Sequence, residues 1–324
     1  MPTGEWPMHW PPLLRRLHAA RGSDARTAMP RLADLLPFDG LEGIDAAVEL
    51  LRHAIACDAH VVVVGDFDCD GATACAVGVR GLRMLGAKHV SHAVPNRIVH
   101  GYGLTPGLVD ELAALQPDLL VTVDHGIACH AGIQAAKVRG WQVLVTDHHL
   151  PGPTLPPADA IVNPNQPGDG FASKALAGVG VMFYLLLALR ARLGVQADLA
   201  ALLDLVAVGT VADMVPLDAN NRALVGAGLR RLRAGQGCVG LRALVEVSGR
   251  RDATLSTADI GFASGPRIKA AGRLDEMSIG GALLLCEDIV EARMQASDLD
   301  ALNLARREIE QEMQADAMQL CAKL

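Results

Sequence analysis

The chain of 324 residues has few aromatic side chains, no closely spaced cysteine pair and no long apolar run. Its seven cysteines are scattered and odd in number, which argues against a disulfide framework and against a cysteine-ligated zinc module. No apolar run reaches the roughly 18 residues of a membrane span. Prolines and arginines interrupt the N-terminal segment where a signal peptide would need continuous apolar residues. We therefore expect a cytoplasmic protein that does not bind a membrane.

Positive charge is also scarce. The chain has 29 Lys and Arg against 36 Asp and Glu, for a formal charge of −7. This balance argues against a polyanionic partner, unless clustered acidic residues hold divalent cations that invert the local charge. Hydrophobic residues are abundant, at 51% of the chain. A chain of this length can bury roughly three quarters of its unfolded surface, so we expect it to be folded.

Short β-branched runs alternate with segments of helical periodicity. The runs predict buried strands at 60–64, 119–123, 143–146 and 160–162. The intervening segments predict helices at 43–51, 72–86, 105–115 and 129–139. This alternation is typical of βαβ units, so we expect an α/β fold with a doubly wound, mostly parallel sheet and helices on both faces.

The second half of the chain is mostly helical by pattern. It begins with an apolar helical stretch at 174–208 and is interrupted by a Gly- and Pro-containing segment at 261–267, which we interpret as a loop. We expect four parts: a helical extension at 1–55, a metal-binding α/β domain at 56–217, a helical substrate-binding segment of the same core at 218–285, and a long helix at 286–324. Because that helix has no terminal Gly or Pro, we expect it to connect to a further C-terminal domain.

Acidic residues and histidines follow the apolar runs. The run at 61–64 leads into Asp66, Asp68 and Asp70, the run at 119–123 into Asp124 and His125, the run at 143–146 into Asp147, His148 and His149, and a fourth run at 205–211 into Asp213. We interpret all four as strand ends. Because ligands bind in the crevice at the carboxyl ends of parallel strands, these side chains should converge there.

Such a cluster would hold about five carboxylates with no lysine nearby in the sequence. Like charges at close range raise one another's pKa, and divalent cations would relieve this cost. Carboxylates suit Mg²⁺ or Mn²⁺, and added imidazole favours Mn²⁺ without excluding Zn²⁺ or Fe²⁺. Two ions could bind a phosphate, activate a water and stabilise a leaving oxygen.

Each motif taken alone has a simpler interpretation. A single aspartate after a strand, such as Asp124 or Asp213, is more often a helix N-cap than a ligand. The segment 66–71 resembles the start of a calcium loop, but position twelve of that loop is Val77 rather than Glu and a strand precedes it. An Asp-His pair is often a capping contact. The four motifs together favour a metal centre.

These segments resemble the DHH phosphoesterase superfamily. Its four motifs are similar to 65–74, 123–127, 147–149 and 209–217. Further segments resemble RecJ-type single-strand-specific exonucleases within it, namely 95–97 with 101–104, 163–165 and 265–274. The resemblance extends from about residue 15 onward. It implies a metal-dependent phosphodiesterase whose relatives continue past the long helix into a Gly-rich domain and an OB-fold.

The resemblance also implies roles for individual residues. The implied metal ligands are Asp68, Asp70, Asp124, His148 and Asp213, with Asp66 as a further member. His149 would orient or protonate the substrate phosphate, and Asp147 would fix the two imidazoles. Asp204, on the helical side of its run, is expected to be structural. His125 and His100 stand at positions where relatives often differ. Either could be an extra metal ligand or phosphate contact, but we expect both to be solvated loop residues.

Three arginines are candidates for binding the DNA backbone or a terminal phosphate. They are Arg97, Arg267 and Arg273. A guanidinium group matches phosphate oxygens in a bidentate way, whereas the alternative for each arginine is an ordinary surface ion pair.

The function implied by the resemblance is a 5′–3′ exonuclease that uses one or two Mn²⁺ or Mg²⁺ ions. It would release 5′-mononucleotides from single-stranded DNA in repair and recombination. A phosphodiesterase of short oligonucleotides or cyclic dinucleotides is the alternative within the superfamily, and a catalytically silent replication or repair scaffold is the alternative of another class. A single-strand-binding protein and a helicase are partners implied by resemblance.

Overall fold

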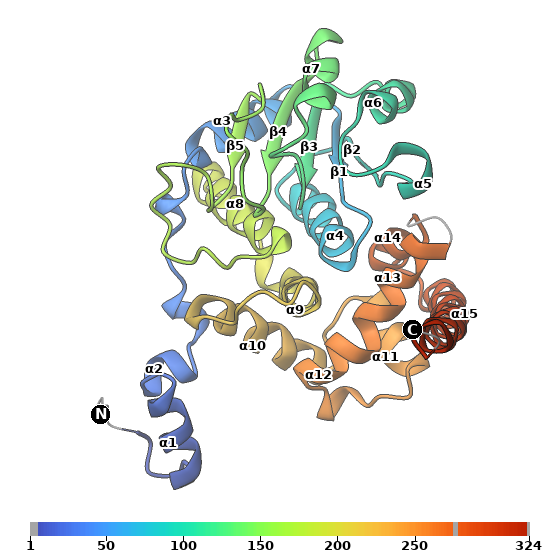
Figure 1. Cartoon of the computed structure of the whole chain (residues 1–324). Helices are drawn as coiled ribbons and strands as arrows, with labels where there is room; N and C mark the ends of the chain where they lie inside the picture. Colours follow the sequence, from blue (N-terminus) through green and yellow to red (C-terminus); the bar gives the residue numbers. More distant parts are fainter. Residues whose placement is uncertain (1–5, 275–277, 323–324) are drawn as a thin grey trace.

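The computed structural model describes residues 6–274 and 278–322. Figure 1 shows one parallel sheet with helices packed against both of its faces, followed by a group of helices that contains the C-terminus. The side chains of five helical residues, at 98, 271, 273, 274 and 278, are outside the described set.

The sheet has five strands in the order β2-β1-β3-β4-β5, all parallel. The strands are β1 (Val61–Val64), β2 (Val90–Ala93), β3 (Leu119–Val123), β4 (Gln142–Thr146) and β5 (Ala160–Val162). Four of them lie within one residue of the predicted runs, so the predicted α/β fold is confirmed. The sequence analysis missed β2, an edge strand in which Ser91 and His92 interrupt the apolar pattern.

The strand order reverses next to β1. The chain goes from β1 to β2 on one side and then crosses to β3 on the other side. Loops that leave β1 and β3 therefore diverge, and they open a crevice at the carboxyl ends of these strands. The register places Val64 beside Thr122, so the segments after the two strands begin within one residue of the same level. The acidic motifs occupy this switch point.

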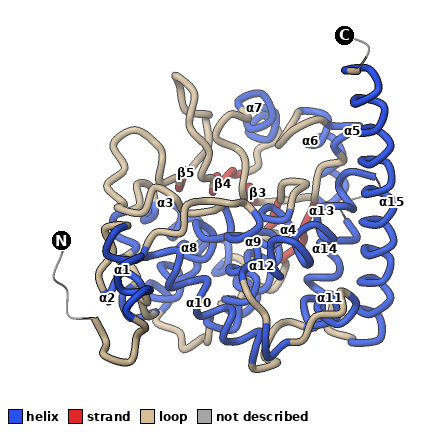
Figure 2. The backbone as a smooth tube through the Cα atoms, turned by 60° about the horizontal axis from the view of Figure 1, so that its bottom comes forward, coloured by secondary structure: helices blue, strands red, loops and turns tan. Residues whose placement is uncertain are grey.

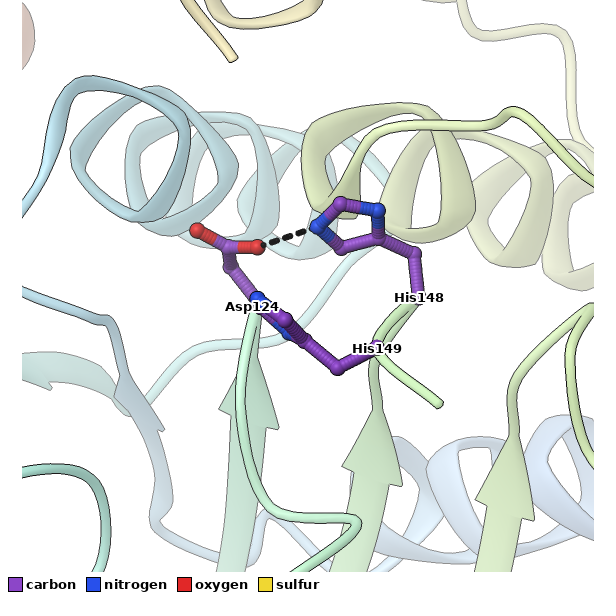
Figure 3. Close-up of side chains that lie close together, drawn as sticks. All are labelled: Asp124, His148 and His149. Carbon is purple, nitrogen blue, oxygen red and sulfur yellow. Dashed lines mark ion pairs between the residues drawn. The ribbon is translucent and has the colours of Figure 1, made fainter. Parts of the chain in front are cut away.

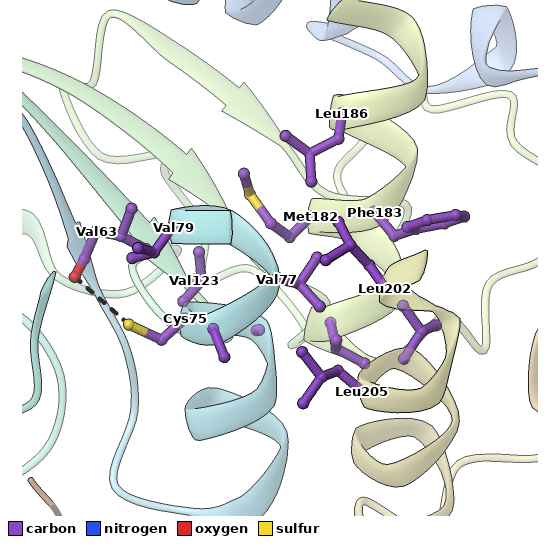
Figure 4. Close-up of a cluster of buried hydrophobic side chains, with 14 of the residues drawn as sticks. Val63, Cys75, Val77, Val79, Val123, Met182, Phe183, Leu186, Leu202 and Leu205 are labelled. Carbon is purple, nitrogen blue, oxygen red and sulfur yellow. Dashed lines mark hydrogen bonds between the residues drawn. The ribbon is translucent and has the colours of Figure 1, made fainter. Parts of the chain in front are cut away.

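The two faces of the sheet have separate apolar cores. One face packs against α3 (Ile44–Ala56), α4 (Cys69–Met84) and α8 (Gly178–Leu193), and the other packs against α6 (Pro106–Leu112) and α7 (His130–Val138). Alternate residues of β1 divide between them, with Val61 and Val63 in the first core and Val62 and Val64 in the second. Figure 4 shows the first core, where Val63 of β1 lies beside Cys75 and Val79 of α4, and Val77 of α4 faces Met182 and Phe183 of α8.

The run at 205–211 is a helix, so its interpretation as a strand end was wrong. It lies within α9 (Leu203–Ala212), which packs against α4, α8 and α10 (Ala219–Arg233). Its first eight residues are all buried, and Asp204 and Thr210 are the polar ones among them. A helix buried on all sides has no polar stripe, and its sequence then cannot be distinguished from a buried strand by periodicity.

The C-terminal helices form a group that packs against α4 through α13 and α14. The group consists of α11 (Val239–Val247), α13 (Gly265–Leu274), α14 (Ser278–Leu285) and α15 (Ile289–Cys321). The segment 261–267 was predicted to be a loop but is helical, because a π-helical turn (Ile260–Ser264) leads directly into α13. Pro266 is tolerated there because it lies in the first turn of that helix.

The long helix α15 is packed at its beginning and exposed toward its end. Ala292, Ala296 and Leu299 are buried against α11 and α13, whereas Met313 and Met318 are exposed. Figure 2 shows α15 along one side of the molecule, reaching beyond the other helices.

Short helices complete the fold. They are α1 (Pro12–Ala20), α2 (Ala25–Ala28), α5 (Arg97–His100) and α12 (Thr257–Asp259). The part of the chain that the structure describes contains no helix both long and apolar enough to cross a membrane. All seven cysteines are free thiols.

Candidate metal centre

The carboxyl ends of β1, β3 and β4 and the end of α9 meet at one site. The loop after β1 carries Asp66 and Asp68, and Asp70 lies in the first turn of α4. Asp124 follows β3, the Asp-His-His segment follows β4, and Asp213 follows the last residue of α9. The structure therefore brings together all six residues that the sequence analysis proposed as metal ligands.

Backbone amides hold two of these carboxylates in place. Asp68 is the N-cap of α4, and its Oδ1 accepts hydrogen bonds from the amides of Asp70 (2.9 Å) and Gly71 (3.1 Å). Asp70 is fully buried, and its carboxylate accepts from the amides of Gly178 (2.6 Å) and Val179 (3.1 Å). The N-terminus of α8 thus points at Asp70, where the helix dipole favours a negative charge.

Two glycines allow the helices to approach the acidic residues closely. A Cβ atom on Gly178 would lie 2.6 Å from the Cβ and Oδ1 of Asp124. A Cβ atom on Gly209 would lie 2.2 Å from Oγ1 of Thr73 and 2.7 Å from Oδ1 of Asp70. Any larger residue would force α8 or α9 away from the site. The sequence analysis assigned Gly178 no role.

Asp124 and His148 face each other without a hydrogen bond. The Oδ1 atom of Asp124 lies 3.1 Å from Nε2 of His148 (Figure 3), yet both atoms are buried and neither has a hydrogen-bond partner. Asp124 also has a φ of 65°, a strained conformation for a residue with a side chain. A buried carboxylate oxygen and a buried imidazole nitrogen that face each other without a hydrogen bond are an arrangement that a bridging cation would satisfy.

The potential ligand atoms form three overlapping groups. In each group all atoms lie within 4.8 Å of one another. The groups are Asp124 with His148 and His149, Asp70 with His148 and Asp213, and Asp66 with Asp68 and Asp124. Carboxylate oxygens with one or two imidazole nitrogens are the donor set of Mn²⁺ or Mg²⁺ sites. The residues present therefore fit one or two such ions.

The electrostatics of the cluster also favour a bound cation. Burial, reinforced by neighbouring carboxylates, raises the pKa values of Asp70 and Asp124 well above the usual range. Burial likewise raises the pKa of Asp66 to about 7 and raises the pKa of Asp213. Burial lowers the pKa of His148, which keeps its imidazole in the neutral form that can bind a metal. A divalent cation would offset this crowding of negative charge.

Asp147 organises the Asp-His-His segment. Its Oδ1 accepts from the amides of His148 (2.7 Å) and His149 (3.0 Å) and from Nδ1 of His149 (2.8 Å), and its Oδ2 accepts from the amide of Ile127 (2.9 Å). Burial alone would raise the pKa of Asp147, but these hydrogen bonds outweigh it and lower the pKa. Asp147 therefore contacts the His149 ring directly, but it reaches His148 only through the backbone.

Two asparagines that follow β5 support the same segment. Nδ2 of Asn163 donates to the carbonyl of His149 (2.9 Å), and Nδ2 of Asn165 donates to the carbonyl of His148 (2.6 Å). They belong to one of the segments that resemble RecJ, and only the tertiary structure shows what they bind.

A lysine reaches the acidic cluster from the C-terminal helices. Nζ of Lys269 in α13 lies 3.1 Å from Oδ2 of Asp68, and the lysine side chain is 42% exposed. The sequence analysis found no lysine partner, because the two residues are 201 positions apart. Lys269 is thus a positive charge at the edge of the cluster that only the fold reveals.

The three candidate arginines have different environments. Arg97 is exposed and lies over the ring of Phe67, 4.9 Å from its centroid. Tyr102 contacts Phe67 and His149 edge-on, so this arginine stands beside the metal centre. The side chain of Arg267, by contrast, is only 12% exposed.

Arg267 is engaged in a structural ion pair. Its guanidinium contacts Oδ1 of Asp300 through Nε (2.8 Å) and NH2 (2.7 Å), and NH1 donates to the carbonyl of Ala263. This ion pair links α13 to α15. The contacts of Arg267 therefore do not support the prediction that it binds phosphate. Arg273 lies in α13, but its side chain is outside the described residues.

Two histidines that we expected to be solvated are packed. His125 is fully buried, its Nε2 lies 3.1 Å from the carbonyl oxygen of Val64, and burial lowers its pKa to about 4. The side chain of His100 is 7% exposed and lies 2.8 Å from Glu111. Both predictions were wrong, because packing against neighbouring strands and loops covers these side chains. Asp204 is structural, since its Oδ2 accepts from the amide of Cys238.

Comparison with known proteins gives consistent results. The model of the DHH family, N-terminal domain, matches residues 60–210. The single-stranded-DNA-specific exonuclease RecJ of Salmonella typhimurium is 55% identical over 99% of this chain. This chain spans 58% of the length of that relative.

Solved structures extend the comparison to the fold. A crystal structure of exonuclease RecJ bound to manganese is 41% identical, with a TM-score of 0.78, over 86% of this chain and 69% of that chain. RecJ of Thermus thermophilus in complex with Mn²⁺ is 36% identical, with a TM-score of 0.79, over 94% of this chain and 46% of that chain. The chain therefore belongs to the RecJ group of the DHH family.

Proposed function

We propose that this chain is the catalytic part of a metal-dependent 5′–3′ exonuclease that hydrolyses single-stranded DNA to 5′-mononucleotides, with roles in DNA repair and recombination. The observation that carries the proposal is the buried contact between Asp124 and His148, whose facing oxygen and nitrogen atoms have no hydrogen-bond partner and belong to a group of six carboxylate and imidazole side chains. The RecJ relatives that this chain resembles over nearly its whole length support the substrate.

The proposed cofactor is Mn²⁺ or Mg²⁺, with one or two ions bound. Asp66, Asp68, Asp70, Asp124, His148 and Asp213 would hold the metal. When bound, such ions polarise a phosphoryl oxygen and promote the attack of water on phosphorus. The related structures in complex with Mn²⁺ and with Mg²⁺ support this choice.

Residues around the ligands would position the substrate. Nδ1 of His149 is held by Asp147, and the imidazole is 47% exposed, so its Nε2 is available to contact or protonate a phosphate oxygen. Arg97 is the candidate to bind the next phosphate, because it is exposed beside His149 and Tyr102. We assign Arg273 the same role from the family motif. Arg267 has its guanidinium committed to Asp300.

We further propose the division of the chain that the sequence suggested. Residues 56–217 form the metal-binding part, 218–285 form the helical part that supplies Lys269, and 286–324 connect to a C-terminal domain like those of longer relatives. We propose a cytoplasmic location, which the seven free thiols support. A single-strand-binding protein and a helicase are the proposed partners.

The test is Mn²⁺-dependent release of mononucleotides from a 5′-labelled single strand, a duplex and a dinucleotide. It compares this chain with a form extended to the length of its relatives. We expect the extended form to digest the single strand, and Asp124→Ala to lose this activity, whereas Asp298→Ala, at an exposed position on α15, should retain it.

Two results would contradict the proposal. Full activity of Asp124→Ala would remove the metal centre from catalysis. If both forms cleave the dinucleotide best, the protein is instead a phosphodiesterase of short oligonucleotides.

A further inference from the structure

A cavity lined by arginines lies away from the metal centre. It has a volume of about 430 Å³ and sits where the end of α4, the start of α9, the end of α10 and the segment before α11 meet. Arg80, Arg83 and Arg231 line it together with Glu287. Arg80 is ten residues after Asp70 in the same helix, which separates the two positions by roughly 15 Å along the axis.

The three guanidinium groups are positioned by carbonyl oxygens. NH1 of Arg80 donates to Leu284 (3.0 Å), NH2 of Arg83 donates to Val90 (2.9 Å), and NH2 of Arg231 donates to the carbonyl of Gln236 at 3.4 Å. These bonds hold the side chains in place, and the buried carboxylate of Asp204 interacts electrostatically with Arg80 and Arg231.

No carboxylate of the described residues lies within ion-pair distance of these three arginines. Nε of Arg231 is also buried without an acceptor. The nearby acid Asp204 is fully buried, with one carboxylate oxygen engaged by the amide of Cys238. With Glu287, the surroundings contain two acidic groups against three arginines. The arginines therefore exceed the acidic groups around the cavity by one positive charge, and the buried Nε of Arg231 has no acceptor, so the cavity offers a place for an anion.

One part of the cavity wall is apolar and is formed by Met84, Ala201, Leu202, Leu205, Val239 and Leu285. The segment 236–238, with the polar Gln236, completes the lining. Guanidinium groups match the oxygens of a phosphate, and an apolar wall accepts a flat ring system. The volume also lies within the range of small-ligand sites.

We propose that this cavity binds a small organic phosphate of the nucleoside monophosphate class. The phosphate contacts Arg80, Arg83 and Arg231, and the base packs against the apolar wall around Leu205. The site is separate from the metal centre, although both lie on the same two helices. Asp70 and Arg80 are toward opposite ends of α4, and Asp213 and Leu205 are toward opposite ends of α9.

Calorimetric titration of the metal-free protein in EDTA tests the proposal. We expect saturable binding of dAMP, weaker binding of inorganic phosphate and none of deoxyadenosine, because the arginines recognise the phosphate. Arg231→Gln should weaken dAMP binding about tenfold or more, since it removes a charged donor. Arg230→Gln is the matched control. Arg230 is adjacent to Arg231 in α10, but its side chain is exposed and does not line the cavity. This variant should bind as the wild type does.

A second variant tests the proposal independently, in case Arg231→Gln fails to fold. Met84→Trp fills the cavity from a partly exposed position and leaves all three arginines in place, so it should abolish dAMP binding without lowering the melting temperature. Arg97→Gln should leave dAMP binding unchanged. The proposal is overturned if the wild type shows no saturable binding, if the Arg230 and Arg231 variants bind alike, or if an oligonucleotide without terminal phosphate binds with the same dependence on Arg231.

Discussion

The two ends of α4 carry clusters of opposite charge. At the first turn, Asp68 and Asp70 belong to a cluster of carboxylates and imidazoles, and at the last turns Arg80 and Arg83 belong to a cluster of arginines that exceeds its nearby acidic groups. Each charge lies at the helix end where the macrodipole favours it. One helix can therefore support a cation site at its N-terminus and an anion site at its C-terminus.

The acidic cluster and the arginine cluster differ in the groups that surround and contact them. The acidic end is enclosed by α8 and α9, and its carboxylates receive backbone amides and the ammonium of Lys269. The arginine end is more open, and carbonyl oxygens alone fix its side chains. Mutations at the acidic end should therefore have larger effects on stability and metal binding than mutations at the arginine end.

The largest expected effect is at Asp124, where one substitution should have opposite effects on stability without and with Mn²⁺. In EDTA, Asp124→Asn should leave the melting temperature unchanged or raise it, because it removes one of several crowded buried carboxylates. With Mn²⁺ at about 100 times the dissociation constant, the wild type should gain about 2.7 kcal/mol and the variant should gain much less. Thermal denaturation with and without Mn²⁺ measures both. Equal stabilisation of the two proteins would contradict a metal role for Asp124.

The next effect tests how closely α8 approaches the acidic end. Gly178→Ala should destabilise the protein by about 1–3 kcal/mol and weaken Mn²⁺ binding, because its Cβ would overlap Asp124. Gly226→Ala, inside α10 with only the flexible end of Arg230 nearby, should instead stabilise by up to about 1 kcal/mol. Denaturation and Mn²⁺ titration of both variants give the comparison. Normal Mn²⁺ binding by Gly178→Ala would show that α8 can move away without loss.

A smaller effect is expected at Lys269. Lys269→Ala should tighten Mn²⁺ binding by roughly two- to fivefold, because it removes a competing cation from Asp68, and the half-exposed pair should contribute little to stability. Lys269→Arg keeps the charge and should bind Mn²⁺ as the wild type does. Electron paramagnetic resonance titration of free Mn²⁺ measures the change. Weaker binding by the alanine variant would mean that Lys269 positions Asp68 rather than competing for it.

The smallest effect should occur at the arginine end. Without added anion, Arg83→Met should change the free energy of unfolding by less than about 1 kcal/mol, because the lost hydrogen bond to Val90 is offset by reduced repulsion among the arginines. Arg267→Met, which breaks a mostly buried pair with Asp300, should cost about 2–3 kcal/mol. Chemical denaturation of both variants tests the contrast. An equal decrease in the free energy of unfolding for both variants would show that Arg83 contributes as much to stability as Arg267 does.

The strands of the sheet could be predicted because their sequences carry a local signal. The runs at 61–64 and 119–123 are apolar or β-branched throughout and are buried on both faces. The edge strand β2 has only one buried residue, Val90, and was missed. The apolar run of α9 gave no periodicity, since its surroundings are apolar on all sides, so it was mistaken for a strand.

The site could be predicted in part for the same reason. The acidic motifs are short segments, so Asp70, Asp124 and His148 could be recognised without the fold. The partners of the long basic side chains could not be predicted from the sequence. Arg267 forms an ion pair with a residue 33 positions away, and Lys269 reaches across 201 positions.

By itself the sequence determined the parallel sheet, the family and the acidic residues and histidines that meet at the candidate metal centre. These features depend on residue types at neighbouring positions, and such patterns can be read locally. Only the tertiary structure decided which acceptors face each other, which arginines are paired, and that Arg80, Arg83 and Arg231 share one cavity. These features depend on distances between elements, which arise only when the helices pack.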